Sequence, residues 1–202
     1  MPMTDKTLFD YLRELVSQGI DPKDRETEIW AAYGQEVAIF VLDSVGFSRT
    51  TESSGIVHFL SKMMQMRERV MPVFDAFKPI HLRLAADNIF AAFRSADDAI
   101  SAAVQVQAAL KSSGIMLNQD EPFQACIGIG FGKLLFSQTL EGYFGDEMNL
   151  ASKLGEDVAK GGEILITTRA WSCAQNQDAS RVRQRQLEIA GMSISYFALD
   201  VP

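Results

Sequence analysis

The chain has 202 residues, of which 47% are hydrophobic and 22% are charged, and its formal net charge is −7. This composition supports a substantial hydrophobic core, while the negative balance argues against non-specific binding to nucleic acid or to an anionic membrane. The longest apolar run is shorter than the ~18–20 residues of a membrane span, and the N-terminus lacks a signal-peptide pattern. We therefore expect a soluble, cytoplasmic protein.

The first 33 residues are expected to form an N-terminal arm. Residues 4–19 have a helical pattern, in which Thr4 can cap the helix and Leu8, Leu12 and Leu15 form an apolar stripe. Residues 21–33 are charged and then aromatic, which indicates a linker. We therefore divide the chain into a helical arm with its linker, residues 1–33, and a main domain, residues 34–202.

The main domain begins with an apolar strand that ends on a carboxylate. The run from Val37 to Leu42 is followed by Asp43 and then by a turn at Gly46. A carboxylate at a strand end can hold a hard cation, and the backbone amides of the following loop can face a phosphate. A long helix over residues 55–77 is expected next, capped by Ser53 and kinked near Pro72.

A second carboxylate, Asp87, lies where two further apolar runs meet. Residues 80–85 and 89–93 are separated by an Asp-Asn pair, which suits a tight hairpin turn. Two carboxylates on neighbouring strand ends, beside an amide-rich loop, can place two Mg²⁺ ions on a triphosphate. The sequence thus predicts a two-metal phosphate site at Asp43 and Asp87.

A helix and a glycine-rich strand are expected in the next part of the chain. Ser95 opens a capping box before a helix that runs through about residue 111. Gly128, Gly130 and Gly132 then alternate within the extended stretch 123–136. Because their spacing is not GxGxxG and no helix follows, we reject a dinucleotide-binding loop. Glycines in a strand usually mark a bulge or a close backbone approach.

The remaining pattern completes a mixed fold. Residues 142–145 form a turn into a helix over 146–159, on which Asn149 and Lys153 share one face, either as a solvated surface pair or as part of a site. A strand near 163–167, a short helix through Trp171, and strands near 181–189 and 194–200 follow. This order predicts an α+β fold with a mainly antiparallel sheet and helices on one side.

Three segments together resemble the catalytic domain of class III nucleotidyl cyclases, the adenylate and guanylate cyclase family. They are Val41–Ser48, Arg83–Phe93, and the stretch from Ile127 to Leu154 that contains Gly128, Gly130 and Asn149. The resemblance covers roughly residues 35–200. It implies a ferredoxin-like βαββαβ core with extra strands, and a head-to-tail homodimer whose active sites lie at the interface.

The resemblance also implies residue roles. Asp43 and Asp87 of one subunit would hold two Mg²⁺ or Mn²⁺ ions, while Asn149 of the other would orient the ribose. Lys153 would supply the cation that stabilises the pentavalent phosphorus as the 3′-hydroxyl attacks the α-phosphorus and pyrophosphate leaves. The phosphate loop would consist of Ser44, Val45, Gly46 and Phe47.

Several positions depart from the family pattern. Arg83 replaces the lysine that recognises a purine, and Gly142 replaces an Asp or Thr that accepts the adenine amino group. Lys153 replaces an arginine, which keeps the charge but loses the guanidinium fork. The family's C-terminal phosphate-binding lysine is absent, with Arg183 or Arg185 as candidates to replace it.

These departures leave several functions open. Arg83 can reach a smaller ring and donate to its carbonyl groups, which favours UTP and then CTP, as expected of the pyrimidine cyclases of bacterial antiphage systems. An adenylate cyclase with a relaxed pocket, or an inactive pseudo-cyclase that acts as a binding partner, are alternatives. A two-metal phosphodiesterase or nuclease fits less well, because His58 and His81 are the chain's two histidines and neither lies near a ligation motif.

Overall fold

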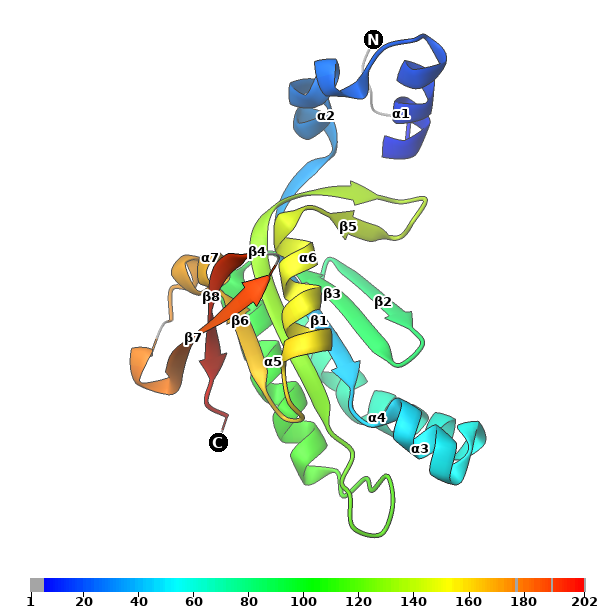
Figure 1. Ribbon diagram of the computed structural model, residues 1–202, viewed down its shortest axis with the longest axis vertical. Helices are drawn as coiled ribbons and strands as arrows, with labels where there is room; N and C mark the ends of the chain where they lie inside the picture. The colour runs from blue at the N-terminus through cyan, green and yellow to red at the C-terminus, as the bar shows by residue number, and fades with distance from the viewer. Residues whose placement is uncertain (1–5, 177, 190, 202) are drawn as a thin grey trace.

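The computed structural model describes residues 6–176, 178–189 and 191–201. The strands among these residues form one mixed sheet, which is packed with helices (Figure 1). The strand order is β2-β3-β1-β4-β6-β8-β7, and β5 pairs with β4 off this path. The strands are β1 (Gly34–Ser44), β2 (His81–Ala85), β3 (Asn88–Phe93), β4 (Ala125–Ser137), β5 (Gly142–Phe144), β6 (Ile164–Thr167), β7 (Val182–Ile189) and β8 (Met192–Leu199). All were expected from the sequence except β5, where a turn was predicted.

The predicted ferredoxin-like core is confirmed. The order β1, α4 (Ile56–Phe77), β2, β3, α5 (Ala96–Ser112), β4 folds so that β1 lies between β3 and β4, antiparallel to both. The β4–β6 pair is parallel, while β8 pairs antiparallel with β6 and β7. The sheet is therefore mainly antiparallel, as the mixed order predicted.

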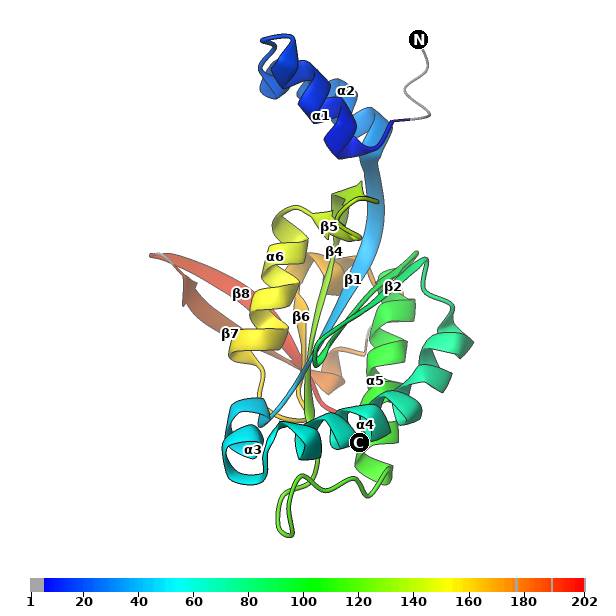
Figure 2. The same cartoon turned by 90° about the vertical axis from the view of Figure 1, so that its right-hand side faces the viewer.

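Helices cover both faces of the sheet, so the expectation of helices on one side is wrong. Figure 2 shows α4 and α5 on one side and α6 (Asp146–Ser152) on the other. Alternate residues of β1 explain this arrangement, because Phe40 and Leu42 are buried with α4 and α5, whereas Ile39 and Val41 are buried against the α6 side. A strand that is apolar on both faces must be covered on both.

The segment after β1 differs from the prediction. A separate helix, α3 (Phe47–Ser54), precedes α4, so Ser53 lies inside α3 and does not cap the long helix. The position before α4 is instead Gly55, whose φ of 84° suits a residue without Cβ. Pro72 lies within α4, as predicted.

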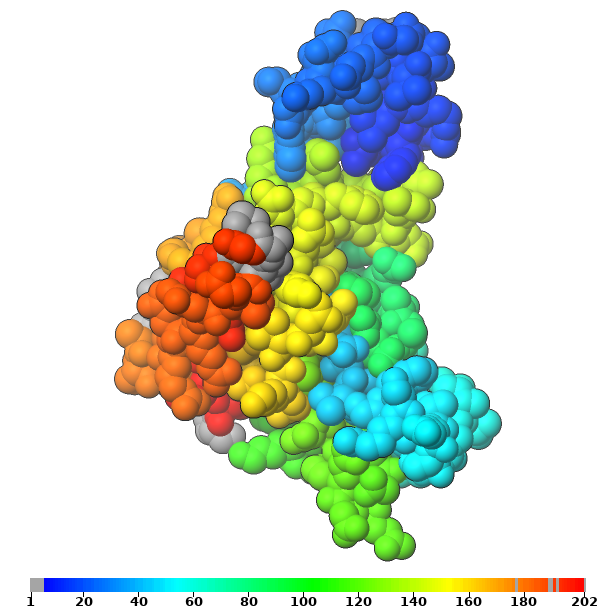
Figure 3. Space-filling view, viewed as in Figure 1, coloured from blue at the N-terminus to red at the C-terminus, as the bar shows by residue number. Residues whose placement is uncertain are grey.

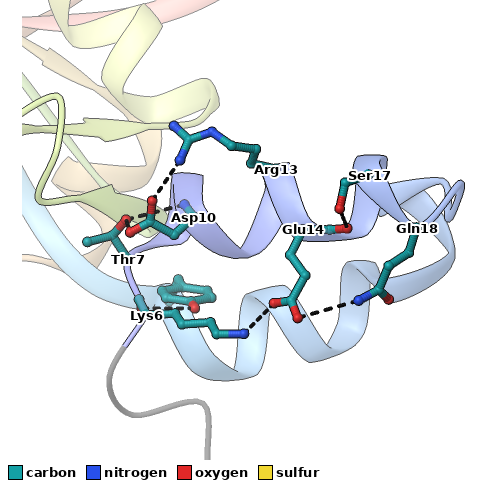
Figure 4. A network of polar contacts seen from close by, with 8 residues as sticks. Lys6, Thr7, Asp10, Arg13, Glu14, Ser17 and Gln18 are labelled. Atoms are coloured by element: carbon teal, nitrogen blue, oxygen red, sulfur yellow. Dashed lines mark hydrogen bonds and ion pairs between the residues drawn. The ribbon is translucent and has the colours of Figure 1, made fainter.

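The described part of the N-terminal arm, residues 6–33, is mostly helical, and the helices extend into the predicted linker. It contains α1 (Leu8–Ser17), the 3₁₀-helix η1 (Pro22–Arg25) and α2 (Glu26–Tyr33). Thr4 lies outside the described residues, and Thr7 is the residue that caps α1, by accepting a hydrogen bond from the amide of Asp10 (Figure 4). Figure 3 shows the arm projecting from one end of the molecule.

The arm leads directly into β1 and packs against the β4–β5 hairpin. Leu8, Leu15 and Ile29 form a small core that includes Leu135 of β4. The ring of Phe9 packs edge-on against Phe144 of β5, with the ring centroids 6.2 Å apart. The arm thus contacts the hairpin and has its own apolar cluster.

Close backbone contact seats α6 on β4. A Cβ at Gly128 would lie 2.0 Å from the carbonyl oxygen of Ala151, and one at Gly130 would lie 2.5 Å from that of Glu147. The alternating glycines therefore mark a close approach, one of the two meanings expected of them. The helix continues as the π-helix η2 (Lys153–Val158), so the predicted single helix over 146–159 changes its winding at Lys153.

The C-terminal part adds two short helices to the sheet. These are α7 (Thr168–Cys173) and the 3₁₀-helix η3 (Ala179–Arg181). No helix in the described part of the chain is long and apolar enough to cross a membrane.

Candidate functional site

The two predicted metal-binding carboxylates lie together at one end of the sheet. Asp43 is near the end of β1, and Asp87 is in the turn of the β2–β3 hairpin (Figure 1), which pairs with β1 at Leu42 and Ile89. The Ser44 hydroxyl donates a hydrogen bond of 2.8 Å to Asp87 Oδ2. Because Ser44 is buried, this bond fixes the hairpin carboxylate beside the strand that carries Asp43.

Asp43 is partly buried and has other carboxylates nearby. Partial burial, followed by the charges of Asp87 and Glu156, raises the pKa of Asp43 to about 6. The pKa of Glu156 is also raised, first by burial and then by Asp157 and Asp87. A cation between Asp43 and Asp87 would relieve this repulsion.

The donor set suits a metal ion that is shared with a phosphate. Across residues 6–176, 178–189 and 191–201, no three His, Cys, Asp or Glu side chains are grouped to hold a metal ion by themselves. Mg²⁺ is commonly bound through one or two carboxylates together with substrate phosphates and water. The paired Asp43 and Asp87 therefore fit a site that a nucleotide completes.

The loop after Asp43 only partly matches its predicted role. The amide of Val45 donates to the carbonyl of Gln124 at 2.9 Å, so the fold uses this amide and it does not face a phosphate. Gly46 has a φ of 93° and precedes α3, whose N-terminus has no side-chain cap. The amides that start at Phe47 therefore form the helix N-terminus available to an anion.

A cavity of about 300 Å³ lies on the α6 side of the sheet. It contains Arg83, predicted to contact the base, and Asn149, predicted to orient the ribose. Apolar and aromatic walls surround them, and the lining residues used below are His81, Phe90, Glu141, Gly142, Tyr143 and Ser152. The guanidinium of Arg83 lies 5.9 Å from the ring centroid of Phe90, so one subunit brings the predicted base and ribose residues together.

Lys153 follows Asn149 by about one helical turn but does not line this cavity. Its ammonium group forms an ion pair of 2.5 Å with Asp157 Oδ2. The structure thus partly matches the solvated-pair interpretation, because Asn149 is exposed and Lys153 is paired with a neighbour on its own helix. A role in phosphate chemistry requires Lys153 to leave Asp157.

The proposed substitutes for a C-terminal phosphate-binding lysine are already paired. Arg183 forms an ion pair with Asp200, and Arg185 contacts Glu163 at 2.9 Å. Both arginines are on β7, at the opposite edge of the sheet from β2. Within this chain they do not join the Asp43–Asp87 pair.

Some neighbours of the site were not identified from the sequence. Glu156 accepts a hydrogen bond of 3.3 Å from the side chain of Asn88 and thereby links η2 to the β2–β3 hairpin. Glu156 lies three residues after Lys153, and residues three apart share a helix face, so this spacing could have identified Glu156 from the sequence. His81 precedes Arg83 by two residues on the same strand, so period-two alternation places both on one face. Glu141, which also lines the cavity, directly precedes Gly142, the position where the resemblance expects an acceptor.

Comparison with solved structures shows that the chain has the fold of class III nucleotidyl cyclase domains. The adenylate/guanylate cyclase/hydrolase from Silicibacter pomeroyi superimposes with a TM-score of 0.70 and 21% identity, over 84% of this chain and 98% of that one. The adenylyl cyclase CyaB from P. aeruginosa gives 0.67 and 17%, over 84% and 95% of the two chains. A rhodopsin-guanylyl cyclase core of converted specificity, in complex with ATPalphaS, gives 0.68 and 14%, over 83% and 98%.

A curated relative matches this chain over a small part of its own length. The protein named "Putative adenylate cyclase 3" of Rhizobium meliloti (strain 1021) is 25% identical over 130 residues, which are 64% of this chain. The match spans only 22% of that protein's length. No protein-family model matches the chain.

Proposed function

We propose that the protein is a nucleotidyl cyclase, which converts a nucleoside triphosphate to a 3′,5′-cyclic nucleotide and pyrophosphate. The observation that carries the proposal is the Asp43–Asp87 pair, which the Ser44 hydrogen bond holds together at one end of a cyclase-like sheet. The Arg83–Asn149 cavity lies on the α6 side of the same sheet. Residues 34–202 are the proposed catalytic domain, and residues 1–33 the appended arm.

Asp43 and Asp87 would hold two Mg²⁺ or Mn²⁺ ions together with the triphosphate. When bound, such ions lower the pKa of the attacking hydroxyl and neutralise charge on the phosphate oxygens. The chain's own part is to position the carboxylates: Ser44 orients Asp87, and the β1–β3 pairing sets its place beside Asp43. The helix N-terminus at Phe47 adds amides that favour a phosphate.

The remaining roles require a second copy of the chain. In a head-to-tail homodimer, Asn149 of one subunit would orient the ribose over the metal pair of the other. Lys153 would exchange Asp157 for the phosphate and stabilise negative charge in the transition state. The exposed ion pair with Asp157 is weak enough to be exchanged in this way.

A pyrimidine is the proposed base. Arg83 provides several donors for carbonyl oxygens, and a cavity of about 300 Å³ with aromatic walls suits a single flat ring. UTP and then CTP are the candidates that follow from Arg83 and Gly142 alone. A pyrimidine product would also support a role in antiphage signalling. An adenylate cyclase is the second candidate, favoured by the name of the curated relative.

An NTP panel tests the activity. Purified protein is incubated with Mn²⁺ or Mg²⁺ and ATP, GTP, CTP or UTP in turn, and the products are identified by mass spectrometry. A cyclic nucleotide that disappears in Asp87→Ala supports the proposal. No cyclic product from any of the nucleotides at high enzyme concentration would overturn it in favour of a pseudo-cyclase.

A further inference from the structure

The cavity contains an acidic residue one position away from the expected base acceptor. Gly142 has no side chain to accept a hydrogen bond, but Glu141 also lines the cavity, as does Arg83 on the β2 strand. Within the described residues, neither the Glu141 carboxylate nor the Arg83 guanidinium has a hydrogen-bond or ion-pair partner. Both residues are exposed, and they line one cavity with a side chain that can accept and a side chain that can donate.

The backbone of Glu141 is held in an unusual conformation. Its φ is 48°, in the left-handed region that non-glycine residues rarely adopt. His81 Nε2 donates a hydrogen bond of 3.1 Å to the carbonyl oxygen of Glu141. The His81 ring in turn packs edge-on against Phe136 and Tyr143, at centroid distances of 5.2 and 6.1 Å. Packing from β2, β4 and β5 thus fixes the position of Glu141.

Strained backbone is retained where the surrounding structure holds it, and such positions cluster at ligand sites. A loop tip without a function would be expected to place glycine or asparagine at a left-handed position. Here the left-handed residue is a glutamate, and Gly142 follows it in a strand.

The chemistry of a donor and an acceptor distinguishes the two pyrimidines. Cytosine presents ring acceptors and an exocyclic amine, so Arg83 can donate to the former while Glu141 accepts from the latter. Uracil presents a carbonyl oxygen in place of the amine and an N3–H donor in place of the N3 acceptor, so both groups on this ring edge change character. An ionised carboxylate cannot donate to that oxygen and repels it.

We infer that Glu141 recognises the exocyclic amine of the base, and that the enzyme prefers CTP to UTP. This inference rests on the proposed cyclase function and reverses the order of the two pyrimidines that Arg83 and Gly142 alone suggest. Glu141 and Arg83 act as a matched pair, with one side chain for each kind of group on the ring edge.

The test compares kcat/KM for CTP and UTP in the wild type and in Glu141→Gln. A good pair of contacts to a base edge discriminates by roughly tenfold or more, so the wild type should favour CTP by about that factor. The glutamine amide can donate to the uracil oxygen as well as accept from the cytosine amine. The ratio in Glu141→Gln should therefore fall to within about twofold of unity, mainly through faster use of UTP.

Glu188→Gln is the matched control. It removes the same charge from an exposed residue on β7, outside the cavity, and it should keep the wild-type ratio. A wild type that favours UTP, or a ratio that Glu141→Gln leaves unchanged, overturns the inference. Circular dichroism melts of the variants check that the hairpin substitution leaves the fold intact.

The inference can fail separately from the proposed function. If the wild type makes no cyclic product, the cyclase proposal fails, and saturation-transfer NMR with CMP and UMP still measures the cavity's preference. Stronger transfer to CMP that Glu141→Gln abolishes supports the role of Glu141, and equal transfer overturns it. If ATP is the best substrate, the pyrimidine preference fails, and comparing ATP with inosine triphosphate tests recognition of the amine in the same way.

Discussion

The Ser44 hydroxyl, buried at the end of β1, donates a 2.8 Å hydrogen bond to Asp87 in the neighbouring hairpin turn. A single side chain thus joins the two segments that carry the proposed metal-binding carboxylates. Ser44 directly follows Asp43 in β1, so this bond links the Asp87 carboxylate to the strand that carries Asp43. Hydrogen bonds to charged groups are among the stronger ones in proteins.

Removing the Ser44 hydroxyl should weaken metal-dependent activity. Hydrogen bonds to ionised groups contribute about 1.5–3 kcal/mol, so Ser44→Ala should raise the half-activating Mn²⁺ concentration by about tenfold or more. The measurement is a Mn²⁺ titration of activity at saturating nucleotide.

Ser61→Ala is the control for this substitution. The Ser61 hydroxyl donates a hydrogen bond of 2.7 Å to the carbonyl of His58 in α4, away from the site. Its Mn²⁺ dependence should match the wild type. Equal Mn²⁺ dependence of Ser44→Ala and the wild type would show that Asp87 does not depend on Ser44.

The raised pKa of Asp43 predicts a pH-dependent cost of folding. An acid whose pKa rises from its ordinary 3.8 to about 6 on folding favours the folded state while protonated, and this advantage is lost as pH increases through that interval. Without metal, Asp43→Asn should therefore unfold at a higher urea concentration than the wild type at pH 7.5. The gain should be on the order of 1 kcal/mol after solvent screening of this half-exposed group.

Below about pH 4 the difference between Asp43→Asn and the wild type should shrink towards zero, because Asp43 is then protonated. Adding Mn²⁺ at pH 7.5 should stabilise the wild type and not the variant. If the variant were less stable than the metal-free wild type at pH 7.5, the burial of the Asp43 charge and its repulsion by neighbouring carboxylates would not be the dominant effect.

Lys153 should matter for rate more than for stability. Removing a single group that stabilises developing charge costs about a hundredfold or more in kcat. The kcat of Lys153→Ala should therefore be lower than that of the wild type by about that factor. Lys153→Arg should retain activity or exceed it, because the guanidinium adds a bidentate fork. Both are compared by kcat and by urea unfolding.

The ion pair with Asp157 is exposed, with 43% and 58% of the two side chains accessible. Its loss in either variant should change stability by less than about 1 kcal/mol. A Lys153→Ala enzyme with the wild-type kcat would remove Lys153 from the proposed chemistry.

The close packing of α6 against β4 should leave no room for a side chain at Gly128. A Cβ there would lie 2.0 Å from the Ala151 carbonyl, so Gly128→Ala should push the helix away at a cost of about 3 kcal/mol or more. Gly132→Ala on the same strand meets the Glu147 side chain at 3.0 Å and no backbone atom within the nearest contacts. It should therefore cost clearly less, and similar urea midpoints for the two variants would contradict the packing described.

Much of the fold was predictable because local signals agreed with tertiary structure. The alternation of Phe40 and Leu42 with Ile39 and Val41 required two covered faces, yet helices were expected on one side only. That error came from treating β1 as a continuous apolar run, without asking what covers each face. The arm's second helix, α2, was missed because its apolar pattern is weak and its N-terminus has no side-chain cap.

The candidate site was predictable as a list of residues, but its contacts were not. Asp43, Asp87, Asn149 and Lys153 follow from sequence patterns and family resemblance. The Ser44–Asp87 bond and the Lys153–Asp157 ion pair depend on side-chain placement across the fold. The His81–Glu141 contact joins residues sixty positions apart, which no local pattern indicates.

Subunit complementation tests the shared two-metal site most directly. Asp43→Ala and Lys153→Ala proteins, each expected to be about a hundredfold or more less active alone, are mixed, allowed to exchange subunits, and assayed with the nucleotide that the wild type cyclises. A heterodimer contains one site with both Asp43 and Lys153 intact, and half of a random mixture is heterodimer, so about a quarter of wild-type activity should return. A mixture that stays inactive although its subunits exchange would contradict a site built from Asp43 of one chain and Lys153 of another.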